Sequence, residues 1–434
     1  MEGSEGGGTE EYVQLTVSSI NFNLRQKMKK EKFDFEEFSR QAGEQLRSGK
    51  PFTGKDGVFT PLIKRILEAS LEGELDVHLD ESRELTGNRR NGHGSKNLKS
   101  SVGSIEISTP RDRNASFEPQ TVGKRQRTVS SDIDKQILAL YSRGMSYSDI
   151  RSHVEDMYGI ELSDGTLTAI TDRIIPEIKE WQNRPLENVY PVIWLDAMHF
   201  KVRHEGMVKS RAIYSVLGVS MDGQKEVIGI YFGDNESSTY WRQVLNDLKM
   251  RGVGDICIAC IDNLKGFADA IEDVYPRTQV QLCLVHQMRN SMKYMNWKDL
   301  KPMVSDLKKV YKANNVELAL SYLEQAEEKW GTKYAVIFKS WRTHWDRLTT
   351  FFQYPPALRR IIYTTNPIES YHRMVRKVTK TKGAFCSEDA IVKQIYLATI
   401  NCNTKWQGTM LGWTSVRVDL NTYFGERLYN DTVN

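Results

Sequence analysis

The chain has 434 residues and a mass of 50.0 kDa, which is too long for one small core and favours about two to four domains. Its 39% hydrophobic, 27% charged and 10% aromatic residues are typical of a globular protein and exclude a largely disordered or fibrous chain. The formal net charge is only +4, from 60 Lys and Arg against 56 Asp and Glu. A nucleic-acid partner must therefore be sought in local clusters of charge.

The chain shows no sign of secretion or of a membrane span. No run of eighteen apolar residues occurs, and the start MEGSEGGGTEEY lacks the basic and apolar regions of a secretory signal. We therefore expect a cytoplasmic protein with no membrane partner. The five cysteines are few and odd in number, which argues against a disulfide scaffold and leaves free thiols or metal ligands as the alternatives.

The N-terminal part changes character twice. Residues 1–30 have no sustained apolar period and are expected to form a flexible leader, whereas 31–82 has apolar residues at helical spacing. Region 83–128 has Gly and Ser turns around the alternating piece VGSIEIST, which predicts a small β element or an ordered linker. It is basic, and a solvated face is the alternative to DNA binding. Its candidate DNA-binding residues are Arg89, Arg90, Lys96, Arg111 and Arg113.

Region 129–185 returns to helical spacing in three segments, of which Gly144 and Gly159 end the first two. Ser163 or Asp164 is placed to cap the third. This spacing resembles a helix-turn-helix that could enter a major groove. An ordinary three-helix bundle is the alternative, and the neighbouring basic segment favours DNA binding.

Region 186–289 predicts an α/β domain. VIWLDAMHFKVR, SRAIYSVLGVS and KEVIGIYFG are β-rich runs joined by short connections, which favour three antiparallel strands. A helix, the strand DICIACID, a second helix and the strand TQVQLCLVH follow, and the apolar runs predict parallel strands buried on both faces. Three antiparallel and then two parallel strands is the order of a ribonuclease-H-like core.

The remainder is predicted to be helical. Region 290–358 is rich in Lys, Glu and Trp and predicts an all-α insertion into the core. Region 359–400 is expected to contain the final core helix, which begins near Asn366. Residues 401–434 are interpreted as a C-terminal tail.

Three acids stand where local propensity does not explain them. Asp196 interrupts the strand VIWLDAMHF, Asp262 closes the strand CIACID, and Glu369 lies at the start of a helix. Buried charges are costly unless they are paired or bind cations. In the predicted sheet the first and fourth strands are neighbours, so Asp196 and Asp262 come side by side, and the final helix presents Glu369 over them.

Each acid also has an ordinary interpretation. Asp196 could be a strand-edge turn residue, Asp262 a helix N-cap, and Glu369 a first-turn acid favoured by the helix dipole. Together they predict a catalytic, metal-binding site, because clustered carboxylates favour hard divalent cations. We expect two Mg²⁺ ions about 3.5 to 4 Å apart, with Mn²⁺ able to substitute, that support in-line phosphodiester chemistry.

The helix that carries Glu369 is strongly basic. From Arg359 to Gly383 there are seven Lys or Arg and a single acid, Glu369. With 3.6 residues per turn, several cations fall on or near the face of Glu369 and could bind DNA phosphates. These candidates are His372, Arg373, Arg376, Lys377 and Lys380.

The cysteines raise a competing hypothesis. Cys257, Cys260, Cys283 and His286 resemble a Cys₃His zinc set. Both pairs lie in predicted strands, where residues three apart point to opposite faces, so we expect no structural zinc and interpret the cysteines as small buried hydrophobes. His286 would end its strand at the edge that carries Asp262, where it either lines the site or is a satisfied core histidine.

Long stretches of the chain carry a family resemblance. These stretches are GNRRNG, TPRDRNASFEPQ, WLDAMHFKVR, RGVGDICIACIDNLKGF, VQLCLVHQMRNSMKY, EEKWGTKY, IIYTTNPIES and RKVTKTKGAF. On them, over nearly its whole length, the chain resembles the Mutator-type transposases of bacterial insertion sequences, a DDE family.

The resemblance implies roles for individual residues. Asp196, Asp262 and Glu369 would be the catalytic acids, and Cys283 with His286 would be the family's C-x-x-H signature. It also implies a ribonuclease-H-like core with a helical insertion, N-terminal DNA-binding helices, and a homodimer that acts on terminal inverted repeats. One departure is Asn263, an active-site neighbour where the family usually has Gly; Asn tolerates the left-handed conformation better than most residues.

The function hypothesis is a nucleoid-associated bacterial transposase. It would bind double-stranded DNA at the ends of its element through residues of about 60–175, cut the strands with Mg²⁺, and join a 3′-hydroxyl to target DNA. Two rivals stay open. One is a ribonuclease-H-like nuclease that hydrolyses without rejoining, and the other is a domesticated DNA-binding protein that has lost catalysis.

Overall fold

The computed structural model describes residues 34–52, 56–100, 103–124, 131–363 and 366–429. These form two compact units. The first contains the described residues up to Asp134 together with Arg151–Leu162, and the second contains Lys135–Ile150 and the described residues from Ser163 onward. The predicted leader, 1–30, lies outside the described residues. The finer division into eight regions stays a prediction.

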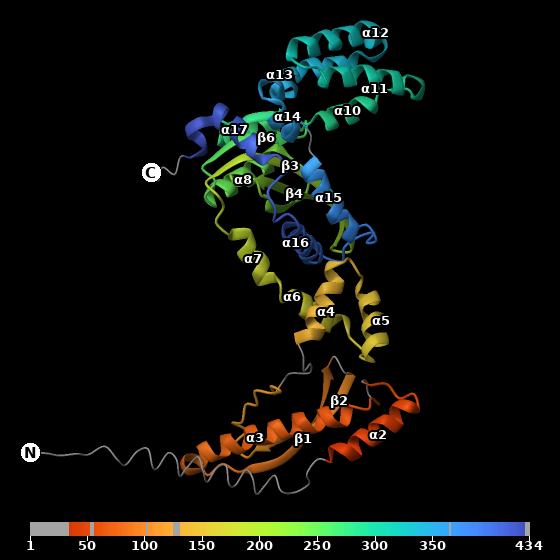
Figure 1. The fold of residues 1–434 in the computed structure, drawn as a ribbon, viewed down its shortest axis with the longest axis vertical. Coiled ribbons are helices and arrows are strands. Elements are labelled where there is room, and N and C mark those ends of the chain that lie inside the picture. The colour runs from red at the N-terminus through yellow and green to blue at the C-terminus, as the bar shows by residue number, and fades with distance from the viewer. Residues whose placement is uncertain (1–33, 53–55, 101–102, 125–130, 364–365, 430–434) are drawn as a thin grey trace, which may run out of the picture. The chain divides into compact units, whose positions relative to one another are not determined.

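The first unit is built on a β-hairpin covered by a long helix. Its elements are α2 (Phe35–Arg47), α3 (Thr60–Thr86), β1 (Arg90–Ser100) and β2 (Gly103–Asp112) (Figure 1). The strands are antiparallel, and Leu98, Ile105 and Ile107 pack with Leu71 of α3 in one small core. The β alternative for region 83–128 is therefore correct. The prediction missed β1, because the run NRRNGHGSKNLKS contains a single large apolar residue.

Four helices precede the sheet. The glycines predicted to end the first two have left-handed φ values, +92° at Gly144 and +62° at Gly159. Ser163 is the N-cap of the third, because its side chain accepts a hydrogen bond from Thr166 N. The predicted helical segments are thus confirmed. The helices are α4 (Ser131–Ser142), α5 (Tyr147–Tyr158), α6 (Asp164–Asp172) and α7 (Ile175–Asn183).

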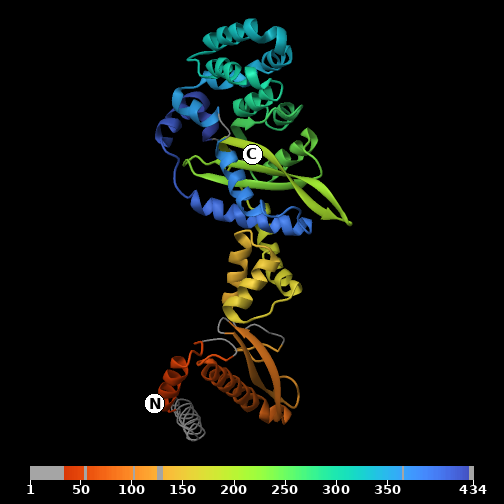
Figure 2. The same ribbon diagram turned by 90° about the vertical axis from the view of Figure 1, so that its right-hand side faces the viewer.

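A mixed sheet forms the core of the second unit. Its spatial order is β5-β4-β3-β6-β7, with antiparallel pairing from β5 to β3 and parallel pairing from β3 to β7. The predicted three antiparallel and two parallel strands are confirmed, and β3 is central. The β3–β4 hairpin extends beyond the rest of the sheet (Figure 2). The strands are β3 (Val189–His204), β4 (Met207–Val219), β5 (Lys225–Gly233), β6 (Asp255–Ile261) and β7 (Gln279–Leu282).

Helices α8 (Ser238–Met250) and α9 (Phe267–Val274) connect the last strands, and an all-α region follows β7, as predicted. The region begins earlier than expected, because β7 ends at Leu282 and Cys283 is already the N-cap of α10. The apolar run LCLV does not distinguish a strand from the first turn of a buried helix. The helices are α10 (Leu284–Met292), α11 (Trp297–Tyr311), α12 (Val316–Thr343), α13 (Trp345–Thr349), η1 (Thr350–Gln353) and α14 (Pro356–Ile362).

Three helices complete the second unit: α15 (Asn366–Thr379), α16 (Glu388–Lys405) and α17 (Trp413–Phe424), with the short η2 (Gly425–Leu428). The start of α15 agrees with the prediction. The described part of region 401–434 belongs to the core, since Trp413 is 4% exposed and a Cβ at Gly223 would lie 2.3 Å from its ring.

No helix in the described part of the chain combines the length and the apolar character that a membrane span needs.

Candidate active site

Asp196 and Asp262 occupy neighbouring strands at the same level. Leu195 of β3 pairs with Ile261, the last residue of β6, in parallel register, and each aspartate is the next residue along the chain. The expectation that the two acids lie side by side is therefore confirmed. Asp196 lies within the central strand, where it pairs with Ser215, and its side chain is 13% exposed. It is not a strand-edge turn residue.

Asp262 turns the chain where β6 ends. Its Oδ1 accepts a hydrogen bond from Leu264 N at 3.2 Å, and the N-cap of α9 is Gly266, so Asp262 is not that helix's cap. The only described non-glycine residues with left-handed φ are Ala115 and Glu205. Asn263 therefore has an ordinary backbone conformation, and a side chain at this position causes no strain.

Helix α15 lies against β3 and β4 and carries Glu369 in its first turn (Figure 1). The face towards the sheet is a stripe of buried residues at helical spacing, which includes Ile368, Tyr371 and Val375. The segment after the helix pairs with β3, because Phe385 N donates to Lys201 O at 2.9 Å and Phe385 O accepts from Arg203 N at 2.8 Å. This anchor fixes the helix across the strand that holds Asp196.

Glu369 is paired with a cation. Its Oε1 accepts a hydrogen bond from Arg289 of α10 at 3.2 Å, and the glutamate side chain is 27% exposed against 57% for the arginine. An exposed pair of this kind is weak and can exchange partners.

Burial and the charges of neighbouring acids raise the pKa of both aspartates. Burial, followed by the charge of Asp262 and then that of Glu236 and Glu369, raises the pKa of Asp196 to about 8. Burial, followed by the charge of Glu236, raises the pKa of Asp262 to about 6. The charges of Asp262, Glu236 and Glu369 thus all act on Asp196, and Glu236 is an acid that the prediction missed.

Two histidines border this cluster. His372 is 4% exposed, and its Nδ1 lies 3.4 Å from Asp196 Oδ2. Burial lowers the pKa of His372 to about 3, so it is neutral at ordinary pH. The prediction grouped His372 with the exposed cations of α15; it belongs instead to the buried stripe, because it lies four residues after Ile368. His286 is partly buried near Asp262, and burial lowers its pKa.

The cysteines have structural contacts. Cys260 Sγ donates to Ile362 O at 3.4 Å and so ties β6 to α14, just before the segment that leads to Glu369. Cys283 Sγ accepts from His286 N at 3.4 Å at the start of α10. The prediction that Cys283 and His286 lie in a strand was wrong, because Cys283 is the N-cap of α10 and His286 lies in its first turn. Cys257 is fully buried in β6.

The donor chemistry of the cluster fits a hard divalent cation. Carboxylate oxygens are the ligands that Mg²⁺ and Mn²⁺ prefer, and a bound cation would favour the charged form of both aspartates, which burial disfavours. As the side chains stand, no three described His, Cys, Asp or Glu residues lie close enough together to hold one ion. Binding would therefore require Glu369 to leave Arg289 and turn towards the aspartates.

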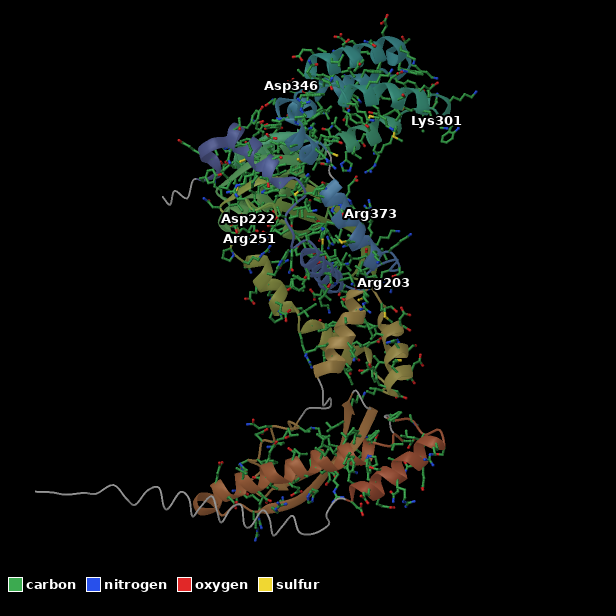
Figure 3. The ribbon with its side chains drawn as sticks, viewed as in Figure 1. Arg203, Asp222, Arg251, Lys301, Asp346 and Arg373 are labelled. Carbon is green, nitrogen blue, oxygen red and sulfur yellow. The ribbon has the colours of Figure 1, made fainter. Side chains whose placement is uncertain are left out.

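The predicted DNA-binding cations differ in their surroundings. Arg373, Arg376 and Lys377 on α15, and Lys380 directly after it, are exposed, as Figure 3 illustrates for Arg373. In the first unit, Arg90 pairs with Glu72 and Asp76, and Lys96 Nζ donates to Gly123 O at 2.6 Å, so both have partners inside the unit. Arg89, Arg111 and Arg113 are exposed, and the last two line a cavity of about 540 Å³.

Comparison with known proteins defines the class. The family model "Transposase, Mutator family" matches residues 35–409. A probable transposase for an ISRM3-like insertion sequence element from Sinorhizobium fredii is 40% identical over 380 residues, which cover 87% of this chain and 95% of that protein. The transposase for ISRM3 of Rhizobium meliloti has the same identity and coverage. The IS256 transposase in transposon Tn4001 of Staphylococcus aureus is 26% identical over 84% of this chain and 94% of its own length.

These relatives are transposases of bacterial insertion sequences. The chain belongs to the Mutator family of these enzymes, which confirms the resemblance found in its sequence. Among solved structures, the Drosophila P element transposase strand transfer complex aligns with a TM-score of 0.29 and 13% identity, over 68% of this chain and 80% of that chain. So low a score adds nothing to the assignment.

Proposed function

We propose that this protein binds the terminal inverted repeats of its own insertion sequence, cuts DNA strands there and joins a 3′-hydroxyl to target DNA. The observation that carries the proposal is the position of Asp196 and Asp262 at the same level on β3 and β6, with Glu369 on the helix anchored across β3. The strand order is the one expected of a ribonuclease-H-like core, whose acids would then be catalytic.

The three acids would act through divalent cations. Asp196, Asp262 and Glu369 are the residues that would hold two Mg²⁺ ions, or Mn²⁺ in their place. When bound, the ions would activate the attacking water or 3′-hydroxyl and stabilise the leaving oxygen. His372 supports Asp196 from its buried side, and the Cys260 contact holds the segment before α15 close to β6.

Arg289 has two partners in this proposal. In the structure it pairs with Glu369. If Glu369 held a cation instead, the exposed guanidinium of Arg289 could pair with a DNA phosphate, for which its planar donor geometry is well suited. The exchange would couple assembly of the acidic site to DNA binding.

The basic face of α15 offers a path for DNA next to Glu369. Lys377 of this helix also lines a cavity of about 580 Å³ together with Arg143 of the α4–α5 connection and Lys405 of α16. We propose that these cations bind the phosphate backbone, that the first unit contributes to recognition of the element's ends, and that the protein acts as a homodimer.

The experiment is strand cleavage and strand transfer with an oligonucleotide duplex that carries the cognate end and a plasmid target. In Mg²⁺, Asp262→Asn should reduce both products by about 10³-fold or more. The matched control is Asp222→Asn, since Asp222 is exposed in the turn between β4 and β5 (Figure 3).

Full cleavage by Asp262→Asn would contradict the proposal. Cleavage without joining by the unaltered protein would identify a nuclease that does not rejoin strands. End binding without any Mg²⁺-dependent product would identify a DNA-binding protein that has lost catalysis.

A further inference from the structure

The β1–β2 hairpin of the first unit and the loop that follows β2 line a cavity of about 540 Å³. Arg111 and Arg113 belong to its lining and are exposed, so they lie at its mouth. We propose that a phosphate group of DNA binds between these two arginines, and that Gly94 of β1 positions Arg111 for it. The inference rests on the proposed function, because it names the site through which the first unit would hold the ends of the element.

Gly94 leaves room for the side chain of Arg111. A Cβ atom at Gly94 would lie 2.8 Å from Cζ and 2.9 Å from Nε of Arg111, which is closer than van der Waals contact allows. The guanidinium group therefore lies directly on the backbone of β1. Gly94 is not among the glycines with left-handed φ, so its backbone conformation is open to other residues. The group that requires a glycine at this position is the guanidinium of Arg111.

Arg111 and Arg113 share one face of the hairpin. Arg113 continues the ladder after β2, because its N donates to Arg89 O at 2.8 Å, and residues two apart on a strand point to the same face. Asp112 between them is 4% exposed. Its carboxylate accepts hydrogen bonds from Asn88 and from the loop that follows. The one acid between the two arginines thus has other partners.

The two guanidinium groups lack an internal counter-ion. Within the ranges that the structure describes, no carboxylate forms an ion pair with Arg111 or Arg113, whereas Arg90 pairs with Glu72 and Asp76. A guanidinium presents its donors in a planar fork that matches the oxygens of a phosphate group. A phosphate group of DNA is therefore the ligand that fits the mouth of this cavity.

The loop after β2 is tied to the hairpin, so the site is formed before DNA binds. Lys96 Nζ of β1 donates to Gly123 O at 2.6 Å, and Lys124 Nζ donates to Ala115 O at 2.9 Å. Phe117, which also lines the cavity, is 5% exposed and anchors the loop in the unit. A preorganised site loses less conformational entropy on binding, which favours affinity.

The test is binding of a fluorescent duplex that carries the cognate end to the full-length protein in EDTA, followed by anisotropy at several salt concentrations. Arg111→Gln should reduce the slope of log affinity against log salt by about 1, the contribution of one phosphate contact. Gly94→Ala keeps the charge but displaces the guanidinium, so it should reduce the slope by a similar amount. The double variant should lose no more than Arg111→Gln alone, since both substitutions remove one interaction. The matched control is Gly73→Ala on α3, where a Cβ meets no atom within 4 Å, and it should leave the slope unchanged.

A second measurement locates the phosphate. Duplexes in which single phosphates are replaced by neutral methylphosphonates should bind the unaltered protein more weakly at one or two positions, and Gly94→Ala should be insensitive to replacement there. If every replacement weakens binding equally in both proteins, or if the losses of the two substitutions add in the double variant, Gly94 does not position Arg111 and the inference is wrong.

Thermal unfolding tests for a merely structural role of Gly94. The atoms nearest to the new methyl group all belong to the end of the Arg111 side chain, and Ala restricts the unfolded chain more than Gly does, so the midpoint of Gly94→Ala should not fall. A lower midpoint with unchanged end binding would overturn the inference.

The inference and the proposed function can fail separately. If the unaltered protein cleaves and joins cognate ends while Gly94→Ala and Arg111→Gln bind them as tightly as it does, this phosphate site is wrong and the proposed function stands. If Asp262→Asn cleaves as the unaltered protein does, the proposed function fails, and the binding measurements in EDTA still decide the phosphate site.

Discussion

In their charged forms, Asp196 and Asp262 destabilise the folded protein. Each is partly buried, the charges of other carboxylates raise its pKa, and burial keeps His372, the histidine beside Asp196, neutral. A site of this kind is assembled for a ligand rather than for stability. The stability of the protein should therefore depend on pH in a way that reports these acids.

The direction of this pH dependence of stability follows from the pKa values. The pKa of Asp196 rises from 3.8 to about 8, and that of Asp262 to about 6, so the folded protein keeps protons that the unfolded chain has released. Between roughly pH 4 and pH 8 the metal-free protein should lose stability as pH rises, by about 1 kcal/mol per pH unit or less for each group. Thermal unfolding in EDTA at pH 5.5 and pH 8 would measure the loss.

The comparison variant is Asp196→Asn, which removes one of the two groups. Its midpoint should fall less than that of the unaltered protein between these pH values, and Mg²⁺ should raise the midpoint of the unaltered protein more at pH 8 than at pH 5.5. Equal pH dependence in the two proteins would contradict the raised pKa of Asp196.

At the scale of elements, the two faces of α15 have different roles. One face buries Ile368, Tyr371 and Val375 against the sheet and α16, where the Tyr371 hydroxyl and Thr399 Oγ1 lie 2.8 Å apart. The other face exposes its cations to solvent. The helix can thus hold Glu369 rigidly while its outer side contacts a polyanion.

The basic face should be visible in the salt dependence of DNA binding. Arg376→Gln with Lys380→Gln should reduce the slope of log affinity against log salt by about 2, since each phosphate contact contributes about 0.9. The matched control is Lys298→Gln with Lys301→Gln on α11 (Figure 3), where two exposed lysines of the insertion change. An equal loss of slope in the control would mean that the effect reports net charge alone. Fluorescence anisotropy at several salt concentrations measures both.

At the scale of the whole molecule, DNA recognition and metal binding are expected to be separable. The acids lie in the second unit, whereas exposed Arg111 and Arg113 belong to the hairpin of the first. Arg111→Gln with Arg113→Gln should weaken binding of the cognate ends and leave the Mg²⁺-dependent rise in unfolding temperature unchanged.

Asp262→Asn should show the opposite behaviour, with end binding retained and the Mg²⁺ effect lost. Gel-shift and thermal-unfolding measurements on the same preparations provide the test. A loss of the Mg²⁺ effect in the arginine variant would contradict the separation.

The prediction from sequence succeeded where periodicity and chemistry agree. The β-rich runs gave the sheet order, and acids within or directly after apolar strands stood out as Asp196 and Asp262. The prediction failed where local composition carries no signal of packing. Strand β1 is rich in Gly, Asn and Ser with one large apolar residue, and the segment around Trp413 is polar and Gly-rich, so local composition does not predict how either packs.

Other misses depend on three-dimensional context. His372 and the cations of α15 share a helix, and only the contact with Asp196 shows that the histidine faces inward. Glu236 acquires its position from Tyr214 and Trp241, which are distant or unremarkable in sequence. Contacts of this kind join residues that the fold brings together, and no sequence pattern near either residue predicts them.

The helical insertion leaves β7 and comes back to it. The chain departs at Cys283, and on its return Gln281 Nε2 donates to Leu348 O at 3.0 Å while Gln281 Oε1 accepts from Phe351 N at 2.7 Å. Since both ends are pinned to one strand, extra residues in the exposed turn between α10 and α11, where Tyr294 is 62% exposed, would lengthen a loop that is already closed, at small entropic cost. A fluorescent reporter spliced in there should travel with the enzyme without disturbing its chemistry, which makes this turn a handle for watching individual complexes assemble on DNA.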